Sequence, residues 1–253
     1  MKRIVGIALL AIASAGCISH PVNPEITPIV GGTVQPLRVL VSIDGGEDAT
    51  SDAYALSGYL QSYLEGSLAV AGYRVVYDGD HEILVSTSGP VTCQPRNSRG
   101  SRLVYYGDLD VQVTRTPFHN PMTGQTMQDI VARQRFDVQG GESRTHTEAI
   151  KSVSDTLGPE LSNWIAQSVT KVAGKLERCE VTISNAWTYR GEEDYPSRFV
   201  ILANRMKGVY MCRLLSTDNA ARSFRAEILY DRDMYPDGIV NGLIATKVFN
   251  LYR

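Results

Sequence analysis

An acidic cluster is the densest group of side chains in this sequence that could bind a ligand. Asp44, Glu47 and Asp48 fall in a glycine-rich loop after an apolar run, a position where α/β proteins often bind ligands. Carboxylates suit a hard cation such as calcium, and together with His81 they could assemble a metal-dependent hydrolase. Acidic residues just before a helix also stabilise the positive end of its dipole. Because the spacing matches no known cation loop, we favour the capping role and predict no metal site.

Motifs that position a nucleophile, a catalytic metal or a phosphate are missing from the sequence. G-x-S-x-G, H-E-x-x-H and G-x-x-x-x-G-K-[ST] do not occur. No two of the four histidines lie within one helical turn of each other. We therefore expect no catalytic residues, no cofactor and no enzymatic activity.

Aromatic residues suggest a different kind of site. The chain has 13 tyrosines, and the segment 187–196 combines Trp187, Tyr189 and Tyr195 with acidic residues. Tyrosine and tryptophan are favoured where one end of the side chain is apolar and the other is wet, as at protein interfaces. We expect these three residues to contact a partner protein. The alternative is a loop that packs its own aromatic side chains.

The amino terminus has the pattern of a secretory signal peptide. Lys2 and Arg3 precede an uncharged apolar stretch at 4–13, which is followed by the small residues before Cys17. This stretch is shorter than the ~20 residues that a spanning helix needs. We expect residues 1–16 to be removed.

The Ser-Ala-Gly-Cys run at 14–17 resembles the bacterial lipobox, although Ser14 stands where leucine is commonest. The resemblance implies that Cys17 is acylated, and two acyl chains suffice for stable membrane attachment. Ile18 follows the cysteine, whereas aspartate there would imply retention in the inner membrane. The resemblance therefore implies the outer membrane, with the body facing the periplasm. Cleavage by an ordinary signal peptidase, leaving Cys17 as a plain thiol, is the alternative.

Residues 17–37 contain four of the 11 prolines and almost no periodicity. Proline-rich segments rise about 3.1 Å per residue, so we expect a semi-rigid tether up to about 60 Å long. A short edge strand from Ile26 to Val30 is the alternative.

Charge and cysteine content restrict the partners and the cross-links. Removal of Lys2 and Arg3 takes the formal charge from −2 to −4, and no basic stripe occurs, so nucleic acid is excluded as a partner. In an oxidising compartment the candidate disulfide joins Cys93 to Cys179, with Cys179–Cys212 as the rival. Strand alternation around Cys212 also fits a buried thiol.

The body is predicted to contain two modules, the first at 38–176. Apolar patterns predict strands at 38–43, 73–77 and 83–86, a helix from Ser51 to Gly72, and a long antiparallel hairpin from 103–115 and 130–138. Thr145 and Glu148 form a capping box before a second helix, which Gly158-Pro159 should kink or split.

The second module, 177–253, repeats a smaller β-α-β-β-α pattern. Strands are predicted at 181–184, 209–216 and 224–230, with helices at 197–206 and after Pro236. The fold class is therefore α+β: two α/β modules with mixed, mostly antiparallel sheets and helices packed on one face.

The lipobox, the tether and the element order of 38–175 are similar to the periplasmic α/β modules of envelope-assembly lipoproteins. This group includes the amino-terminal domain of TolB, the curli secretion lipoprotein CsgG and the penicillin-binding-protein activator LpoB. The resemblance implies a scaffold or assembly factor that binds another envelope protein, and a homo-oligomer is compatible with it. It carries over no functional residue beyond Cys17. Cell-wall glycan binding and metal-dependent hydrolysis are the alternative functions.

Overall fold

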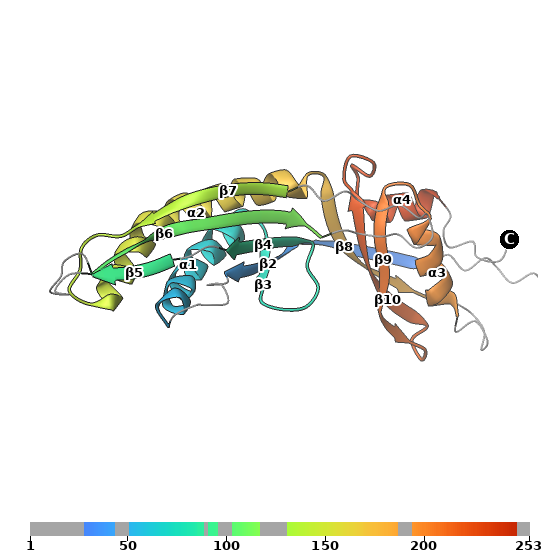
Figure 1. Cartoon of the computed structure of the whole chain (residues 1–253). Helices are drawn as coiled ribbons and strands as arrows, with labels where there is room; N and C mark the ends of the chain where they lie inside the picture. Colours follow the sequence, from blue (N-terminus) through green and yellow to red (C-terminus); the bar gives the residue numbers. More distant parts are fainter. Residues whose placement is uncertain are drawn as a thin grey trace, which may run out of the picture.

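The computed structural model describes residues 28–43, 51–88, 91–95, 103–116, 131–186 and 194–246. They form two β-sheets that follow one another along an elongated body, and helices lie against each sheet (Figure 1). The predicted α+β class with mostly antiparallel sheets is confirmed.

The larger sheet has six strands. β2 pairs in parallel with β3 and β4, and the remaining pairings are antiparallel. The predicted long hairpin is present, since nine consecutive residue pairs join β6 to β7. Four strands follow one another in the order β3 (Arg74–Val76), β2 (Arg38–Ile43), β4 (Ile83–Ser88) and β6 (Leu103–Arg115). β6 also pairs with β5 (Val91–Pro95) and with β7 (Val131–Gln139).

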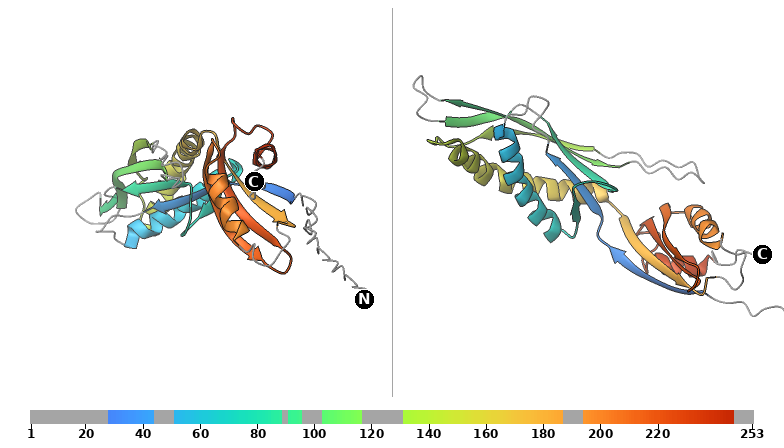
Figure 2. Two further views of the ribbon diagram at one scale, coloured as in Figure 1. Left: turned by 90° about the vertical axis from the view of Figure 1, so that its right-hand side faces the viewer. Right: turned by 90° about the horizontal axis from the view of Figure 1, so that it is seen from below.

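Helices α1 (Ser51–Val70) and α2 (His146–Ala173) lie on one face of this sheet (Figure 2). Leucines four residues apart, from Leu56 to Leu68, bury one stripe of α1 because this spacing places them on a single helix face. The predicted capping box begins α2, where the Thr145 hydroxyl accepts a hydrogen bond from the Glu148 amide at 3.3 Å.

Of the predicted kink or split at Gly158-Pro159, the split does not occur, because α2 runs unbroken with Pro159 inside it. Gly158 has a packing role instead. A Cβ atom there would lie 2.7 Å from the ring of Tyr63 on α1. The glycine therefore allows the two helices to approach closely.

The smaller sheet has four antiparallel strands, in the order β1 (Ile29–Gln35), β8 (Leu176–Ser184), β10 (Ser223–Asp231) and β9 (Val209–Asp218). Helices α3 (Tyr195–Asn204) and α4 (Ile239–Ala245) accompany it. Alternate residues of β10, from Phe224 to Tyr230, point into the core beneath these helices. The predicted strands and helices of this module are confirmed, but β8 begins at Leu176, well before the predicted start at residue 181.

Within the predicted tether, the structure corrects residues 29–35. They form β1, which pairs with β8 over seven consecutive residues. β8 already pairs with β10 on its other side, so main-chain hydrogen bonding draws the amino-terminal segment into the sheet. Pro28 and Pro36 flank the strand and do not interrupt it. The second module is consequently discontinuous in sequence, and the rest of the predicted tether lies outside the described residues.

In the part of the chain that the structure describes, no helix is both long enough and apolar enough to cross a membrane.

Candidate functional site

The joint between the two sheets brings together buried groups that are far apart in the sequence. The chain crosses this joint twice. β1 continues into β2 through Pro36 and Leu37, and α2 continues into β8 through Gly174 and Lys175. Gly174 has a φ of 57°, and its amide donates to the carbonyl of Thr170 at 3.2 Å, which ends α2 at the joint.

β10 is buried on both faces where it meets the larger module. Ile228 and Tyr230 belong to the core of the smaller module, while Leu229 between them belongs to the core of the larger one. Leu176 and Met211 pack against the same larger core. Period-two alternation thus joins two hydrophobic cores through one strand.

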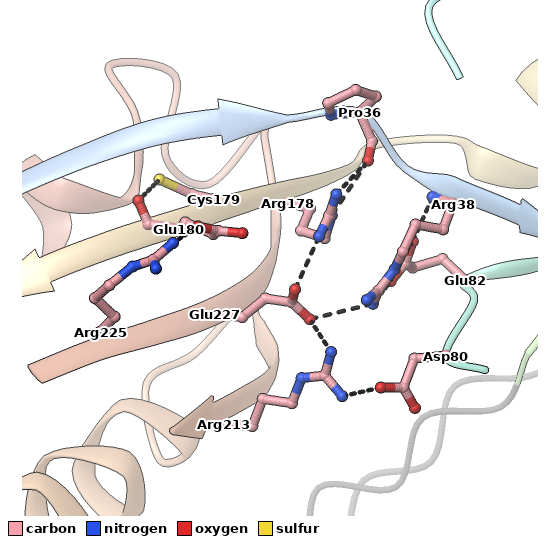
Figure 3. A network of polar contacts seen from close by, with 10 residues as sticks. All are labelled: Pro36, Arg38, Asp80, Glu82, Arg178, Cys179, Glu180, Arg213, Arg225 and Glu227. Carbon is pink, nitrogen blue, oxygen red and sulfur yellow. Dashed lines mark hydrogen bonds and ion pairs between the residues drawn. The ribbon is translucent and has the colours of Figure 1, made fainter. Parts of the chain in front are cut away.

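Glu227 on β10 is the centre of a charge network at this joint (Figure 3). Its side chain is 2% exposed and forms ion pairs with three arginines on three different strands. Arg178 on β8 donates at 2.8 Å, while Arg38 on β2 and Arg213 on β9 each lie 3.1 Å away. Glu227 therefore links both sheets.

Two further acids complete the network from the larger module. Glu82 is 1% exposed, and its carboxylate accepts from the Arg38 amide at 2.6 Å and from Arg38 Nε at 3.0 Å. Asp80 forms an ion pair with Arg213 across the joint. Arg178 also donates through Nε and Nη2 to the carbonyl of Pro36, at 3.2 and 2.8 Å. The crossing at Pro36 is thereby tied to β8.

Three arginines face three carboxylates, so the formal charges of the network balance. Burial lowers the pKa of Arg38, but its hydrogen bond to Glu82 and the charge of Glu82 outweigh this and raise the pKa above its usual value. Burial likewise lowers the pKa of Arg213, but its hydrogen bond to Asp80 raises it, and the net shift is upward. The hydrogen bond from Arg213 lowers the pKa of Asp80. All three shifts favour the charged, paired state.

This arrangement is suited to holding two modules in one geometry. The carboxylates and guanidinium groups of the network neutralise one another, and breaking one buried pair would leave an uncompensated charge. Two backbone crossings and the packing of Leu176, Met211 and Leu229 with the larger core act at the same place. The joint is therefore built as a stiff connection.

No protein-family model matches the chain. No curated protein matches it either. Among solved structures, a minor lipoprotein from Acinetobacter baumannii is 12% identical and covers 54% of this chain and 95% of its own, with a TM-score of 0.28. PelC from Paraburkholderia phytofirmans is 16% identical, covers 53% of this chain and 96% of its own, and has a TM-score of 0.24. Rare lipoprotein B from Shewanella oneidensis is 11% identical, covers 53% and 89%, and has a TM-score of 0.20. TM-scores this low assign neither a fold family nor a function to the chain.

The structure corrects one of the three predicted partner-binding residues. Tyr195 is 3% exposed and packs in the core of the smaller module, with its ring 6.2 Å from that of Phe224. It lies at the start of α3, where the first turn of the helix turns it inward. Trp187 and Tyr189 lie outside the described residues, so their predicted role remains a prediction.

Neither candidate disulfide is formed, because Cys179 and Cys212 are free, buried thiols. Both residues are register partners of Ile228, one on each side of β10. Two strand spacings of about 4.8 Å separate them, beyond the ~7 Å that a disulfide spans. Cys93 lies on β5 in the other sheet, at the end far from β8 (Figure 1). Burial raises the pKa of Cys179 to about 11 and that of Cys212 to about 12.

The acidic cluster Asp44, Glu47 and Asp48 lies outside the described residues. His81 is described, and its Nδ1 atom lies 2.9 Å from the carbonyl oxygen of Gly79. Within the described ranges, no group of three or more histidine, cysteine, aspartate or glutamate side chains could hold a metal ion. The sequence analysis placed none of Asp80, Glu82 and Glu227 in a site. The available signal near Glu227 was Leu229, an apolar residue at the next solvent-type position of the same strand.

Proposed function

We propose that this chain is a non-enzymatic lipoprotein, anchored in the outer membrane through a lipid on Cys17, whose periplasmic body is a scaffold or adaptor for an envelope protein complex. The proposed membrane location rests on the residue pattern at 1–17. The scaffold role rests on one observation in the structure. The buried Glu227 network ties the two modules together, and this suits a body that holds bound partners in a fixed relative position.

The anchor is tested by replacing Cys17 with serine. Mass spectrometry of the processed wild-type amino terminus is expected to show acyl groups on Cys17, and the wild type is expected to sediment with outer-membrane markers. The Cys17→Ser chain is expected to be released as soluble protein with unchanged circular dichroism. An unmodified Cys17 in the processed wild type would refute the anchor.

The scaffold role is tested by loosening the joint. Glu227→Gln removes the shared carboxylate, whereas Glu180→Gln changes a partly exposed glutamate that is its direct register partner on β8. After chemical cross-linking in cells, the amount of complex between this chain and its partner protein is expected to fall in Glu227→Gln and to be unchanged in Glu180→Gln. Equal amounts of cross-linked complex in both variants would contradict a role for the stiff joint. Turnover of an ester, glycan or phosphate substrate by the purified body would contradict the non-enzymatic assignment.

A further inference from the structure

The edges of the two sheets are protected to very different degrees. An edge strand presents unpaired N–H and C=O groups, and proteins usually block such edges with charges, short strands, bulges or covering side chains. β3 has only three residues, one of them Arg74. β7 carries Arg133 and Arg135, both exposed and paired with aspartates of β6.

β9, the far edge of the smaller sheet, is blocked by a side chain. Asn204 of α3 accepts from the Cys212 amide at 2.7 Å and donates to the Cys212 carbonyl at 2.9 Å, as a neighbouring strand would. Two register irregularities further distort the pairing of this strand. A second strand therefore cannot add here in regular register.

β1, the other edge of the same sheet, shows none of these devices among the residues that the structure describes. Its sequence, IVGGTVQ, contains no charge and no proline, and its pairing with β8 is regular along all seven residues. In the described part of the chain, β8 is its one strand neighbour. Ile29 and Val34 are 64% and 55% exposed. This is the kind of edge to which another strand can add.

We propose that β1 is a homotypic docking strand, whose free edge pairs antiparallel with β1 of a second copy about a two-fold axis through Gly32. The two four-stranded sheets would then become one continuous sheet. This inference deepens the proposed function by naming one contact of the scaffold.

The sequence of β1 is self-complementary in this arrangement. With the ends of the two strands flush, Val30 of each copy faces Val34 of the other, and Gly31 faces Thr33. An isologous interface brings each patch against itself, so a charged strand would repel its own copy, and β1 carries no charge. The two-fold axis falls at Gly32, where a Cβ would meet Val240 of α4 at 2.5 Å, so α4 packs tightly at the centre of the docking strand.

Membrane confinement supplies the concentration that such a contact needs. One seven-residue strand pair buries less than the ~1,200 Å² typical of stable interfaces, so it is weak in dilute solution. Only eleven residues separate Cys17 from Ile29, which keeps β1 within about 45 Å of an acylated Cys17. Copies anchored in one membrane would meet at high effective concentration.

Site-specific cross-linking in cells tests the pairing and its register. Gly31→Cys and Thr33→Cys chains carry different tags, retain Cys17 and replace Cys93 with serine. Opposite residues in an antiparallel pair have Cα atoms about 4.5–5.5 Å apart, which a disulfide spans, whereas diagonal ones are about 7–8 Å apart. Co-expression is expected to give a disulfide-linked dimer about tenfold more abundant than either variant alone gives. Equal amounts of disulfide-linked dimer in the co-expressed sample and in the two single variants would overturn the proposal.

A charge pair provides the second measurement, since nothing lies within 4 Å of a Cβ added at Gly31. Energy transfer is measured between labelled full-length chains in vesicles. In the proposed register the two copies of residue 31 are diagonal neighbours, about 7–8 Å apart and within reach of each other's long side chains. Gly31→Lys and Gly31→Glu are therefore each expected to dimerise about fivefold more weakly than the wild type, and an equal mixture of the two is expected to regain wild-type dimerisation. Val131→Lys, at an exposed residue of the β7 edge, is the matched control and should behave as wild type. Monomeric wild-type chains in which the β1 amides that point away from β8 are protected from hydrogen exchange would show another occupant and overturn the proposal. Mass spectrometry of Cys17 reports separately on the anchor.

Discussion

Replacing Glu227 with glutamine measures how much the buried network contributes to stability. Glutamine keeps the size of the side chain but removes one of the three negative charges, leaving the network with a net charge of +1. Removing one partner of a buried ion pair typically costs about 3–5 kcal/mol. Arg213 is 34% exposed, so water can compensate part of its loss, and we expect the lower end, about 3 kcal/mol.

Thermal unfolding followed by circular dichroism provides the assay. At about 2–4 °C per kcal/mol for a domain of this size, Glu227→Gln should lower Tm by about 6–12 °C. Glu180→Gln is the control, since Glu180 lies directly opposite Glu227 and pairs with the exposed Arg225 at 2.5 Å. Exposed pairs contribute about 1 kcal/mol or less. Equal Tm values for the two variants would refute the claim that the network stabilises the contact between the two modules.

The remaining predictions concern packing, edge protection and thiol reactivity. Gly158→Ala should destabilise the protein by about 1–2 kcal/mol in urea unfolding, because the new Cβ meets the ring of Tyr63, and Tyr63→Ala should relieve this cost. Asn204→Ala should cost about 2 kcal/mol and speed hydrogen exchange at Cys212, since it exposes the β9 edge; unchanged exchange would contradict this. With pKa values of about 11 and 12, Cys179 and Cys212 should carry about 100-fold and 1,000-fold less thiolate at pH 8 than thiols of pKa 9.0, so mass spectrometry should find them alkylated only after unfolding.

Local patterns in the sequence were sufficient to predict most elements of the fold. Leucines at helical spacing predicted α1, the capping box predicted the start of α2, and alternation predicted the β6–β7 hairpin. Each of these depends on interactions within one segment or between neighbours in the chain. β1 was assigned to a tether because its partner, β8, lies about 150 residues later, and no local pattern records that pairing.

The joint was missed for a related reason that concerns strand faces. In β10, the residues between Phe224, Ala226 and Ile228 occupy positions that alternation assigns to solvent, so a charge such as Glu227 looks like an ordinary surface residue. A second module covers that face and turns the same position into a buried one, which requires partners from other strands. Leu229, an apolar residue at the next solvent-type position, was the one local sign that this face is covered. A charge and a leucine alternating on the outer face of a strand therefore favour a module contact over open solvent, and Glu227→Gln against Glu180→Gln tests that rule on one sheet.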